Sequence, residues 1–457
     1  MSTMTDLDPG FLPAARWTQD YQRRVAASPQ ARSVRLALLR PDGSGSTYDT
    51  QICGDSNSRA DAVLHLDRLV KFLLWQRGAS RVVIEGTDAC TAELAARYSP
   101  KGKRHFDADF FGASVFRSSF VIETGVVADL EIAESAVSSV GRHLDGCRVG
   151  FDLGGSDRKC AAVRDGEVIF AEEIEWDPYF ETDPAYHLAG INDSIARAAA
   201  HLPRVDAIGG SAAGVYVDNE VRIASLFRGV SPADFESQVR PIFQRLGAQW
   251  GDVPVIVIND GEVSALAGSM AMNQNGVLGL AMGTSQAVGY VTPSGHVTNW
   301  LNELAFAPVD YRADAPVDEW SGDQGCGVQY FSQQAVARLA PLAGLQYPAD
   351  MPFPEQLIEV QSRMAAGDER AAAIYRCIGV YLGWSVIHYD AFYDLSTLLL
   401  LGRVTSGDGG ALMIDQARSI LAAEAPEIAA RVSLQTPDER SKRLGQAVAA
   451  ASLPALR

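Results

Sequence analysis

An acid, a glycine pair, a hydroxyl and a cation follow one another in the segment VGFDLGGSDRKCAAV. Asp152 is a carboxylate of the kind that holds hydrated Mg²⁺. Gly154 and Gly155 let backbone N–H groups approach phosphate oxygens without a Cβ in the way, and Ser156 and Lys159 add a hydroxyl donor and a positive charge. The pattern predicts a strand, a phosphate-binding turn and a second strand. The alternative is an ordinary glycine-containing β-hairpin.

A second candidate lies at the end of a β-branched run, residues 253–260, which is typical of a buried strand. The run ends in Asn259 and Asp260, directly before a helical pattern that extends to Met272. In open α/β sheets, ligands bind at the carboxyl ends of the strands. We therefore expect these two polar side chains to face a ligand.

Two further apolar runs also end in glycine. Residues 277–291 contain two short strands around a turn formed by Gly283, Thr284 and Ser285. A run of four leucines later in the chain ends at Gly402, ahead of a helical pattern. Taken singly, each is an ordinary core strand with its turn. Their joint order is more informative.

This order resembles that of the ROK family (repressor, open reading frame, kinase), a sugar-kinase branch of the actin-like ATPases. The resemblance covers roughly residues 149–457. It implies an α/β fold with two actin-like lobes of ribonuclease-H type around a cleft. The two glycine turns would then hold the phosphates of ATP, and Gly402 would contact its adenosine.

The resemblance also implies roles for the polar residues. Asp152 would position Mg²⁺, and Asp260 would accept the proton of the attacking hydroxyl. Asn259 and Glu303 would orient a polyol, and Ser211 would lie in the strand on the substrate side. The implied activity is ATP-dependent phosphorylation of a sugar or a cyclitol-like polyol.

Three positions depart from the family pattern. Phe306 stands where the family has a zinc-binding histidine, the loop from Asp323 to Ser332 keeps a single cysteine, Cys326, and Val328 replaces a sugar-binding glutamate. A structural zinc site needs about four N or S ligands. We therefore expect no zinc, and an acceptor other than ordinary glucose or N-acetylhexosamine.

The first 148 residues lie outside the resemblance and are predicted to form an accessory α/β domain. Their expected order of strand, strand, helix and strand matches the opening of the following lobe, which suggests a degenerate copy of it. We divide the chain into this domain (1–148), lobe one (149–270) and lobe two (271–457), with a C-terminal helix returning to lobe one.

Residues 105–120 place five phenylalanines among two aspartates and an arginine. Core packing or a subunit contact explains such a segment, and a lid or a rim of the substrate site is the alternative.

Composition limits the cellular role. A formal charge of −17 argues against a nucleic-acid partner, and no segment has the apolar length of a membrane span. Six cysteines without metal or redox spacing and an N-terminus without a secretory pattern predict a cytoplasmic protein, with a homodimer left open. Two alternatives to the kinase remain: a degenerate nucleotide or sugar sensor, and an assembly protein.

Overall fold

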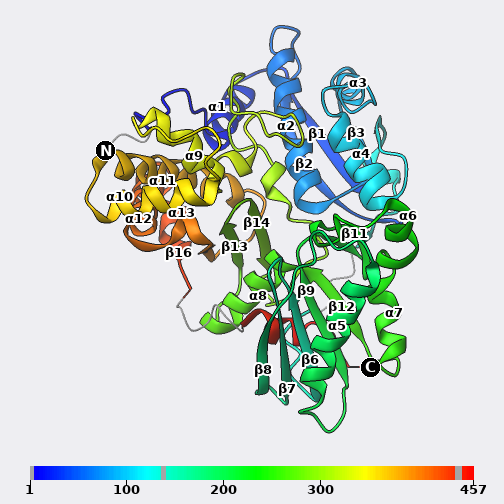
Figure 1. Cartoon of the computed structure of the whole chain (residues 1–457). Coiled ribbons are helices and arrows are strands. Elements are labelled where there is room, and N and C mark those ends of the chain that lie inside the picture. Colours follow the sequence, from blue (N-terminus) through cyan, green and yellow to red (C-terminus); the bar gives the residue numbers. More distant parts are fainter. Residues whose placement is uncertain (1–4, 135–139, 438–444, 457) are drawn as a thin grey trace.

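Three sheets of four or five strands form the framework of the computed structural model, which describes residues 5–134, 140–437 and 445–456. One sheet belongs to the N-terminal domain, one to lobe one and one to lobe two (Figure 1). No helix among these described residues is long and apolar enough to cross a membrane.

The N-terminal sheet has the strand order β4-β3-β1-β2-β5. Its central strand β1 pairs antiparallel with both β2 and β3. The strands are β1 (Ala31–Leu39), β2 (Ser44–Cys53), β3 (Arg81–Glu85), β4 (Val121–Thr124) and β5 (Ala133–Glu134). The helical segments are α1 (Ala14–Ala26), α2 (Arg59–Arg77), α3 (Asp88–Arg97), α4 (His105–Asp109) and the π-helical turn η1 (Phe110–Phe116).

Lobe one contains the sheet β8-β7-β6-β9-β12, in which β6, β9 and β12 run parallel. Their carboxyl ends therefore meet at one edge. The strands are β6 (Cys147–Leu153), β7 (Asp157–Arg164), β8 (Glu167–Glu175), β9 (Ala207–Ala212), β12 (Val255–Asn259) and the hairpin β10 (Val215–Val217) and β11 (Glu220–Ile223). The helices are α5 (Pro184–Ala199), α6 (Pro232–Asp234) and α7 (Ile242–Gln249).

The pairing of lobe one overturns one expectation about the N-terminal domain. In lobe one, β9 is parallel to β6, whereas β3 of the N-terminal sheet is antiparallel to β1. The order of elements also differs, because three strands (β6, β7 and β8) precede the helix α5 in lobe one, whereas two strands precede α2 in the N-terminal domain. The hypothesis of a degenerate copy is therefore wrong.

Lobe two is built on the sheet β14-β13-β15-β16 and a group of helices beside it (Figure 1). The strands are β13 (Val277–Met282), β14 (Gln286–Val291), β15 (Thr397–Leu401) and β16 (Ser433–Gln435). The helices are α8 (Asp260–Met272), α9 (Gln333–Leu342), α10 (Phe353–Ala365), α11 (Glu369–Asp390), α12 (Gly407–Glu424) and α13 (Pro426–Arg431).

Two helices join the lobes. The C-terminal helix α14 (Gly445–Ala451) packs against β6, β7 and β9. A Cβ at Gly150 or Gly209 would lie 1.8 or 1.6 Å from a carbonyl oxygen of α14, so only glycine allows this contact. Helix α8 packs against β13, β14 and α14, and the predicted lobe boundary at residue 270 falls inside it.

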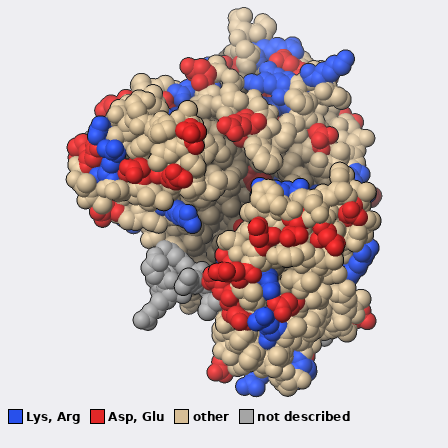
Figure 2. Space-filling view, in the orientation of Figure 1, with Lys and Arg blue, Asp and Glu red and all other residues tan. Residues whose placement is uncertain are grey.

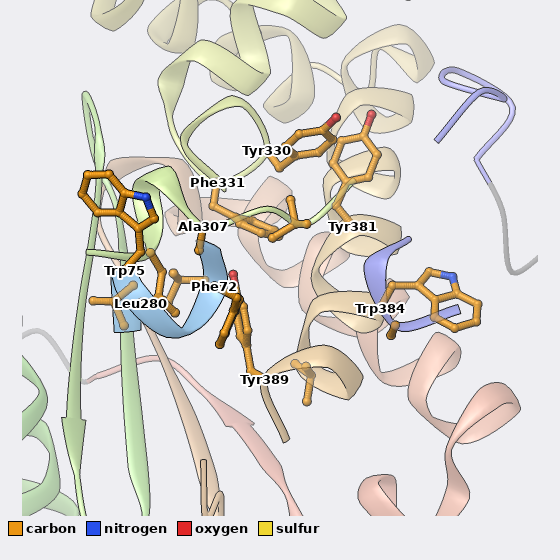
Figure 3. Packing of buried hydrophobic residues seen from close by; sticks show 14 of the residues in the cluster. Phe72, Trp75, Leu280, Ala307, Tyr330, Phe331, Tyr381, Trp384 and Tyr389 are labelled. Carbon is orange, nitrogen blue, oxygen red and sulfur yellow. The ribbon is translucent and has the colours of Figure 1, made fainter. Parts of the chain in front are cut away.

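The N-terminal domain and lobe two share one hydrophobic core. Phe72 and Trp75 of α2 belong to the same cluster of buried side chains as Leu280 of β13 and Tyr389 of α11 (Figure 3). Lobe one has a separate core. The N-terminal domain is thus packed onto lobe two as one body, and the cleft separates this body from lobe one.

Buried ion pairs reinforce this contact. Asp323 of lobe two lies 2.9 Å from a guanidinium nitrogen of Arg68 and 3.4 Å from the Lys71 ammonium, and it is also paired with Arg104. Burial alone raises the pKa of Asp323, but the charges of Lys71, Arg68 and Arg104 outweigh burial and hold it well below its usual value. The loop that carries Asp323 is therefore fixed by N-terminal cations.

Candidate active site

Asn259 and Asp260 lie at the junction of β12 and α8. The Asn259 side chain caps the helix: its Oδ1 accepts a hydrogen bond from the backbone N–H of Gly261 at 2.7 Å, and its Nδ2 donates to the carbonyl of Gly214 at 2.8 Å. Asp260 is consequently fixed as the first helical residue. Burial, with a further contribution from the charge of Asp152, raises the pKa of Asp260 to about 6.

Asp152 lies near the end of β6, beside Asp260. One carboxylate oxygen accepts a 2.5 Å hydrogen bond from the Ser211 hydroxyl, and the other lies 3.6 Å from the Lys159 ammonium. Ser211 is fully buried. It therefore holds Asp152 in place, and the predicted role of Ser211 in substrate binding stays a prediction. Burial also raises the pKa of Asp152.

Lys159 is engaged by carboxylates in this structure. Its ammonium lies 2.5 Å from the Asp157 carboxylate, closer than to Asp152. The sequence predicted a phosphate ligand at this position. A bound phosphate would therefore compete with the carboxylates of Asp157 and Asp152 for the Lys159 ammonium.

The first glycine turn, between β6 and β7, packs against aromatic side chains. The indole N–H of Trp176 donates to the carbonyl of Gly154 at 2.8 Å. A Cβ at Gly155 would lie 2.1 Å from the Tyr179 hydroxyl, and the Arg228 guanidinium lies 3.8 Å from the centre of the Tyr179 ring. Sequence reasoning missed Trp176 and Tyr179, because nothing in their spacing points to this turn.

The second glycine turn joins β13 to β14. The N–H of Gly283 donates to the carbonyl of Ser285 at 2.9 Å, and Thr284 and Ser285 are exposed. A Cβ at Gly283 would meet only the Ser285 carbonyl, at 3.6 Å. Packing therefore does not require glycine here, and the turn is open to a ligand. Ser156 of the first turn is exposed in the same way.

A cavity of about 560 Å³ opens beside Gly402, between the end of β15, α12 and β16. Gly402 has a φ of +91°, and a Cβ there would lie 2.4 Å from the Met282 carbonyl, so the position requires glycine. Leu400 and Ile414 supply apolar walls, and Arg418 lies at the polar side. The cavity has the mixed lining of small-molecule sites.

A second cavity, of about 430 Å³, lies at the carboxyl end of β12. Asn259, Glu262 and Glu303 line it. Burial, with the nearby charge of Asp260, raises the pKa of Glu303 to about 8. The space-filling view is hollowed where the three parts of the molecule meet (Figure 2).

Glu262 is a site residue that the sequence analysis used only as part of a helical pattern. Burial raises its pKa to about 8, and its carboxylate accepts hydrogen bonds from the backbone N–H of Tyr290 at 3.0 Å and from the Asn302 side chain at 2.5 Å. Acids are common in the first turn of any helix. Its spacing from Asp260 therefore gave no specific signal.

The Phe-rich segment lies partly in the core and partly at the 430 Å³ cavity. Phe111 is fully buried and packs against Trp75, so it belongs to the core. Phe116, at the end of the same segment, lines the 430 Å³ cavity. Phe116 therefore lies at the edge of this cavity. The ring of Phe110 instead packs on that of Trp75, with 4.5 Å between the ring centres.

The positions that depart from the family pattern are apolar or buried. The Phe306 ring stacks on Trp75 at 4.4 Å, and Cys326 and Val328 are buried. Among the described residues, no group of three or more His, Cys, Asp or Glu side chains could hold a metal ion. Mg²⁺ commonly takes one or two carboxylates and completes its shell with water and phosphate oxygens. Asp152 and Asp260, which repel each other, fit such an ion.

No protein-family model and no curated protein matches the sequence. Among solved structures, the ROK hexokinase of Thermus thermophilus is similar, with a TM-score of 0.51 at 22% identity over 66% of this chain and 97% of that one. The chain has the fold of the ROK kinases.

Other ROK structures are similar at lower scores. A ROK glucokinase from Streptomyces griseus, solved with glucose and AMPPNP, has a TM-score of 0.48 at 21% identity over 67% of this chain and 98% of its own. A putative N-acetylmannosamine kinase from Listeria monocytogenes has a TM-score of 0.49 at 16% identity over 67% of this chain and 97% of its own. The ROK fold confirms the predicted α/β architecture of two actin-like lobes.

Proposed function

We propose that the protein is an ATP-dependent kinase that phosphorylates a hydroxyl of a sugar or cyclitol-like polyol. The observation that supports this most directly is the position of Asp260. It lies at the carboxyl end of β12, on the N-terminus of α8, and interacts electrostatically with Asp152 and with Glu303. Packing alone does not require a buried acid at this point.

In the proposed mechanism, Asp260 accepts the proton of the attacking hydroxyl. A pKa of about 6 suits this role, because the carboxylate is ionised at neutral pH and still basic enough to take a proton. Glu303 would hold a hydroxyl of the polyol, and Asn259 would fix the strand end beside it. Positioning and electrostatic stabilisation provide most of the remaining rate enhancement in such transfers.

The nucleotide would lie along the lobe-two side of the cleft. The cavity beside Gly402 would take the adenosine, and the exposed turns at Gly154–Ser156 and Gly283–Ser285 would bind the phosphates through backbone N–H groups. Asp152 would hold Mg²⁺, which neutralises phosphate charge. Ser211 keeps the Asp152 carboxylate in one orientation.

A ligand sensor without turnover is the second candidate. Two observations favour it: the Lys159 ammonium is held by Asp157, and Val328 is buried where the family pattern places a polar substrate contact. Such a protein would bind nucleotide or sugar and release no ADP. A cytoplasmic location and a homodimeric assembly remain predictions in either case.

The test measures ADP release from ATP and Mg²⁺ over a panel of sugars, amino sugars and cyclitols. On the best acceptor, Asp260→Asn should lower kcat by roughly 10²–10⁴-fold, because it removes the base and keeps the shape. Its nucleotide affinity should persist. Asp252→Asn, an exposed aspartate of lobe one, is the matched control.

The outcomes separate the two candidates. Saturable nucleotide binding without ADP release on any acceptor would identify a sensor. Near-native transfer by the Asp260→Asn protein would place the proton acceptor at another residue.

A further inference from the structure

The N-terminal domain contributes to the cavity that holds the proposed acceptor site. The cavity is bordered by β10 to β12 of lobe one, by the segment 297–303 of lobe two, and by Arg40, Pro41, Asp42 and Phe116 of the N-terminal domain. Its 430 Å³ falls in the range of roughly 300–1,000 Å³ that accommodates drug-sized ligands, which are larger than one sugar ring.

Hydrogen bonds at the end of α2 fix this wall to the proposed catalytic segment. The last carbonyls of a helix have no partner within it. Here the carbonyls of Trp75 and Gln76 accept hydrogen bonds from the backbone N–H groups of Glu303 and Asn302, each at 2.9 Å. The backbone that carries Glu303 is thus paired with the N-terminal domain.

Arg40 extends the same attachment. Its guanidinium donates to the carbonyls of Arg77 and Gly78 at the end of α2 and to that of Asn299 at 2.7 Å. It also lies 5.5 Å from the centre of the Phe116 ring. Phe116 and the turn that contains Arg40 are therefore fixed in position relative to the segment 297–303.

The wall also reaches lobe one. The turn η1, which ends in Phe116, contacts β11, and the neighbouring Arg117 lies 3.8 Å from Glu236 of lobe one. Asp218, in the turn between β10 and β11, acts electrostatically on Arg40. The N-terminal domain therefore faces lobe one across the far end of the cavity.

The charged side chains at the end of the cavity where the N-terminal domain faces lobe one determine which ligands it can bind. The two arginines among the described lining residues are both engaged, Arg40 by three carbonyls and Arg222 by Glu220 at 3.0 Å. Asp42 and Asp218 are exposed carboxylates. Hydrogen bonds from Ser44 outweigh the partial burial of Asp42 and lower its pKa, which keeps it ionised. This end accepts hydrogen bonds and repels anions.

We propose that the N-terminal domain forms the outer wall of the acceptor pocket and that the acceptor is an uncharged glycoside of two rings. This inference rests on the proposed kinase function and names its substrate class. One ring would lie at Asn259 and Glu303. The second would lie between Phe116 and Trp300, with hydroxyls donating to Asp42 and Asp218. A phosphorylated or carboxylated second ring is excluded by the two carboxylates.

The test compares acceptors of one and two rings. ADP formation is measured with glucose, galactose, glucosamine and myo-inositol, and with maltose, cellobiose and galactinol. The best two-ring acceptor should have a kcat/KM at least about tenfold above that of the best single-ring acceptor. A tenfold ratio corresponds to the free energy of one or two added hydrogen bonds. A single-ring acceptor that equals or exceeds every glycoside overturns the proposal.

Variants of the outer wall give the second readout. Asp42→Asn and Asp218→Asn should each lower the ratio of two-ring to single-ring kcat/KM by about tenfold. Asp129→Asn, an exposed aspartate of the same domain outside the cavity, is the control and should keep the wild-type ratio. An unchanged ratio in both wall variants contradicts the proposal.

Failure of the kinase function would look different. If no acceptor yields ADP, titration calorimetry with maltose, cellobiose and galactinol in the presence of AMPPNP decides the question. Binding that weakens in Asp218→Asn supports the two-ring pocket in a protein without turnover. Absence of binding to all three glycosides overturns the pocket as well.

Discussion

Gly155 has two reasons to be glycine, and the sequence shows only one of them. A phosphate-binding turn needs a bare backbone. In the folded chain, the space that a Cβ would need is also occupied by the Tyr179 hydroxyl, at 2.1 Å. The contact joins a hairpin turn to a loop more than 20 residues away, and no local pattern reveals it.

The two reasons can be separated by a double-mutant cycle. Gly155→Ala should lower the free energy of unfolding by about 1–3 kcal/mol, the usual effect of overpacking. In a Tyr179→Ala background the same change should have little effect on stability, because the side chain that the new Cβ would meet has been removed. If the turn also needs a bare backbone to bind phosphate, the nucleotide affinity lost through Gly155→Ala should stay low in both backgrounds.

Urea unfolding and nucleotide titration of the four proteins check this. Recovery of nucleotide affinity in the double variant would show that Tyr179 packing alone requires the glycine. An equal stability loss in both backgrounds would show strain within the turn itself.

At the scale of single residues, the places of polar side chains at strand ends could be predicted from the sequence, but their hydrogen-bond partners could not. Asp260 follows a β-branched run and lies at the junction of β12 and α8, as expected. Ser211 also lies on a strand of the same sheet, yet its hydroxyl is committed to Asp152. The difference depends on which neighbouring strand lies beside it, and that is set by the fold.

The helix α2 shows how far an element can be predicted. The helix expected in the N-terminal order is observed as Arg59–Arg77, with Ser58 at the N-cap position. Its apolar residues surround the whole helix, which indicates burial on all sides. The sequence did not show that the covering side chains come from lobe two, nor that its last carbonyls bind the Glu303 backbone.

Element order proved a weaker guide to the N-terminal sheet. The N-terminal domain has the expected order of strand, strand, helix and strand, whereas lobe one has a third strand, β8, before its helix. A helical connection can also return the next strand in either direction. Here β3 returns antiparallel to β1. Hydrophobic periodicity carries no information about this direction.

The junction at the end of α2 gives an element-scale prediction. Gly78 has a φ of +77°, and a Cβ there would lie 2.8 Å from the Leu301 side chain. Gly367, in the turn between α10 and α11, has the same φ of +77° with nothing within 4 Å. Gly367→Ala should therefore cost only the left-handed backbone penalty, about 1–2 kcal/mol. Gly78→Ala should cost more and also displace the substrate segment.

Thermal or urea unfolding and acceptor kinetics compare these two variants. The Gly78→Ala protein should show a raised acceptor KM, whereas the Gly367→Ala protein should keep the wild-type KM. Equal effects of both on stability and KM would mean that the contact between Gly78 and Leu301 does not position the Glu303 segment.

At the scale of the whole molecule, the N-terminal domain and lobe two form one body through contacts that are distant in sequence. Asp323 meets Arg68 and Lys71, which lie about 250 positions earlier. Breaking a buried ion pair leaves an uncompensated charge, so such pairs fix the loop they hold. The sequence showed that the loop keeps a single cysteine, but its attachment to the N-terminal domain could be seen only in the fold.

Two buried histidines mark the same interface. His65 of α2 and His388 of α11 line a cavity of about 120 Å³ between the N-terminal domain and lobe two. Burial lowers the pKa of His65 to about 4 and that of His388 to about 3. Both are therefore neutral in the folded chain. When the chain unfolds, each returns to an ordinary pKa near 6.5.

The unfolded state consequently binds more protons than the folded state below pH 6.5. The two histidines therefore lower the free energy of unfolding as the pH falls. Each contributes about 1.4 kcal/mol per pH unit, or about 2 kcal/mol between pH 6.5 and pH 5. Relative to wild type, His388→Gln should therefore gain about 2 kcal/mol in the free energy of unfolding over this interval, whatever its stability at pH 7. Urea unfolding at pH 7, 6 and 5 measures the difference, with His105→Gln, an exposed histidine of the N-terminal domain, as control. Parallel pH profiles for His388→Gln and wild type would mean that His388 can be protonated within the folded interface, so that the N-terminal domain and lobe two admit a charge at their contact without separating.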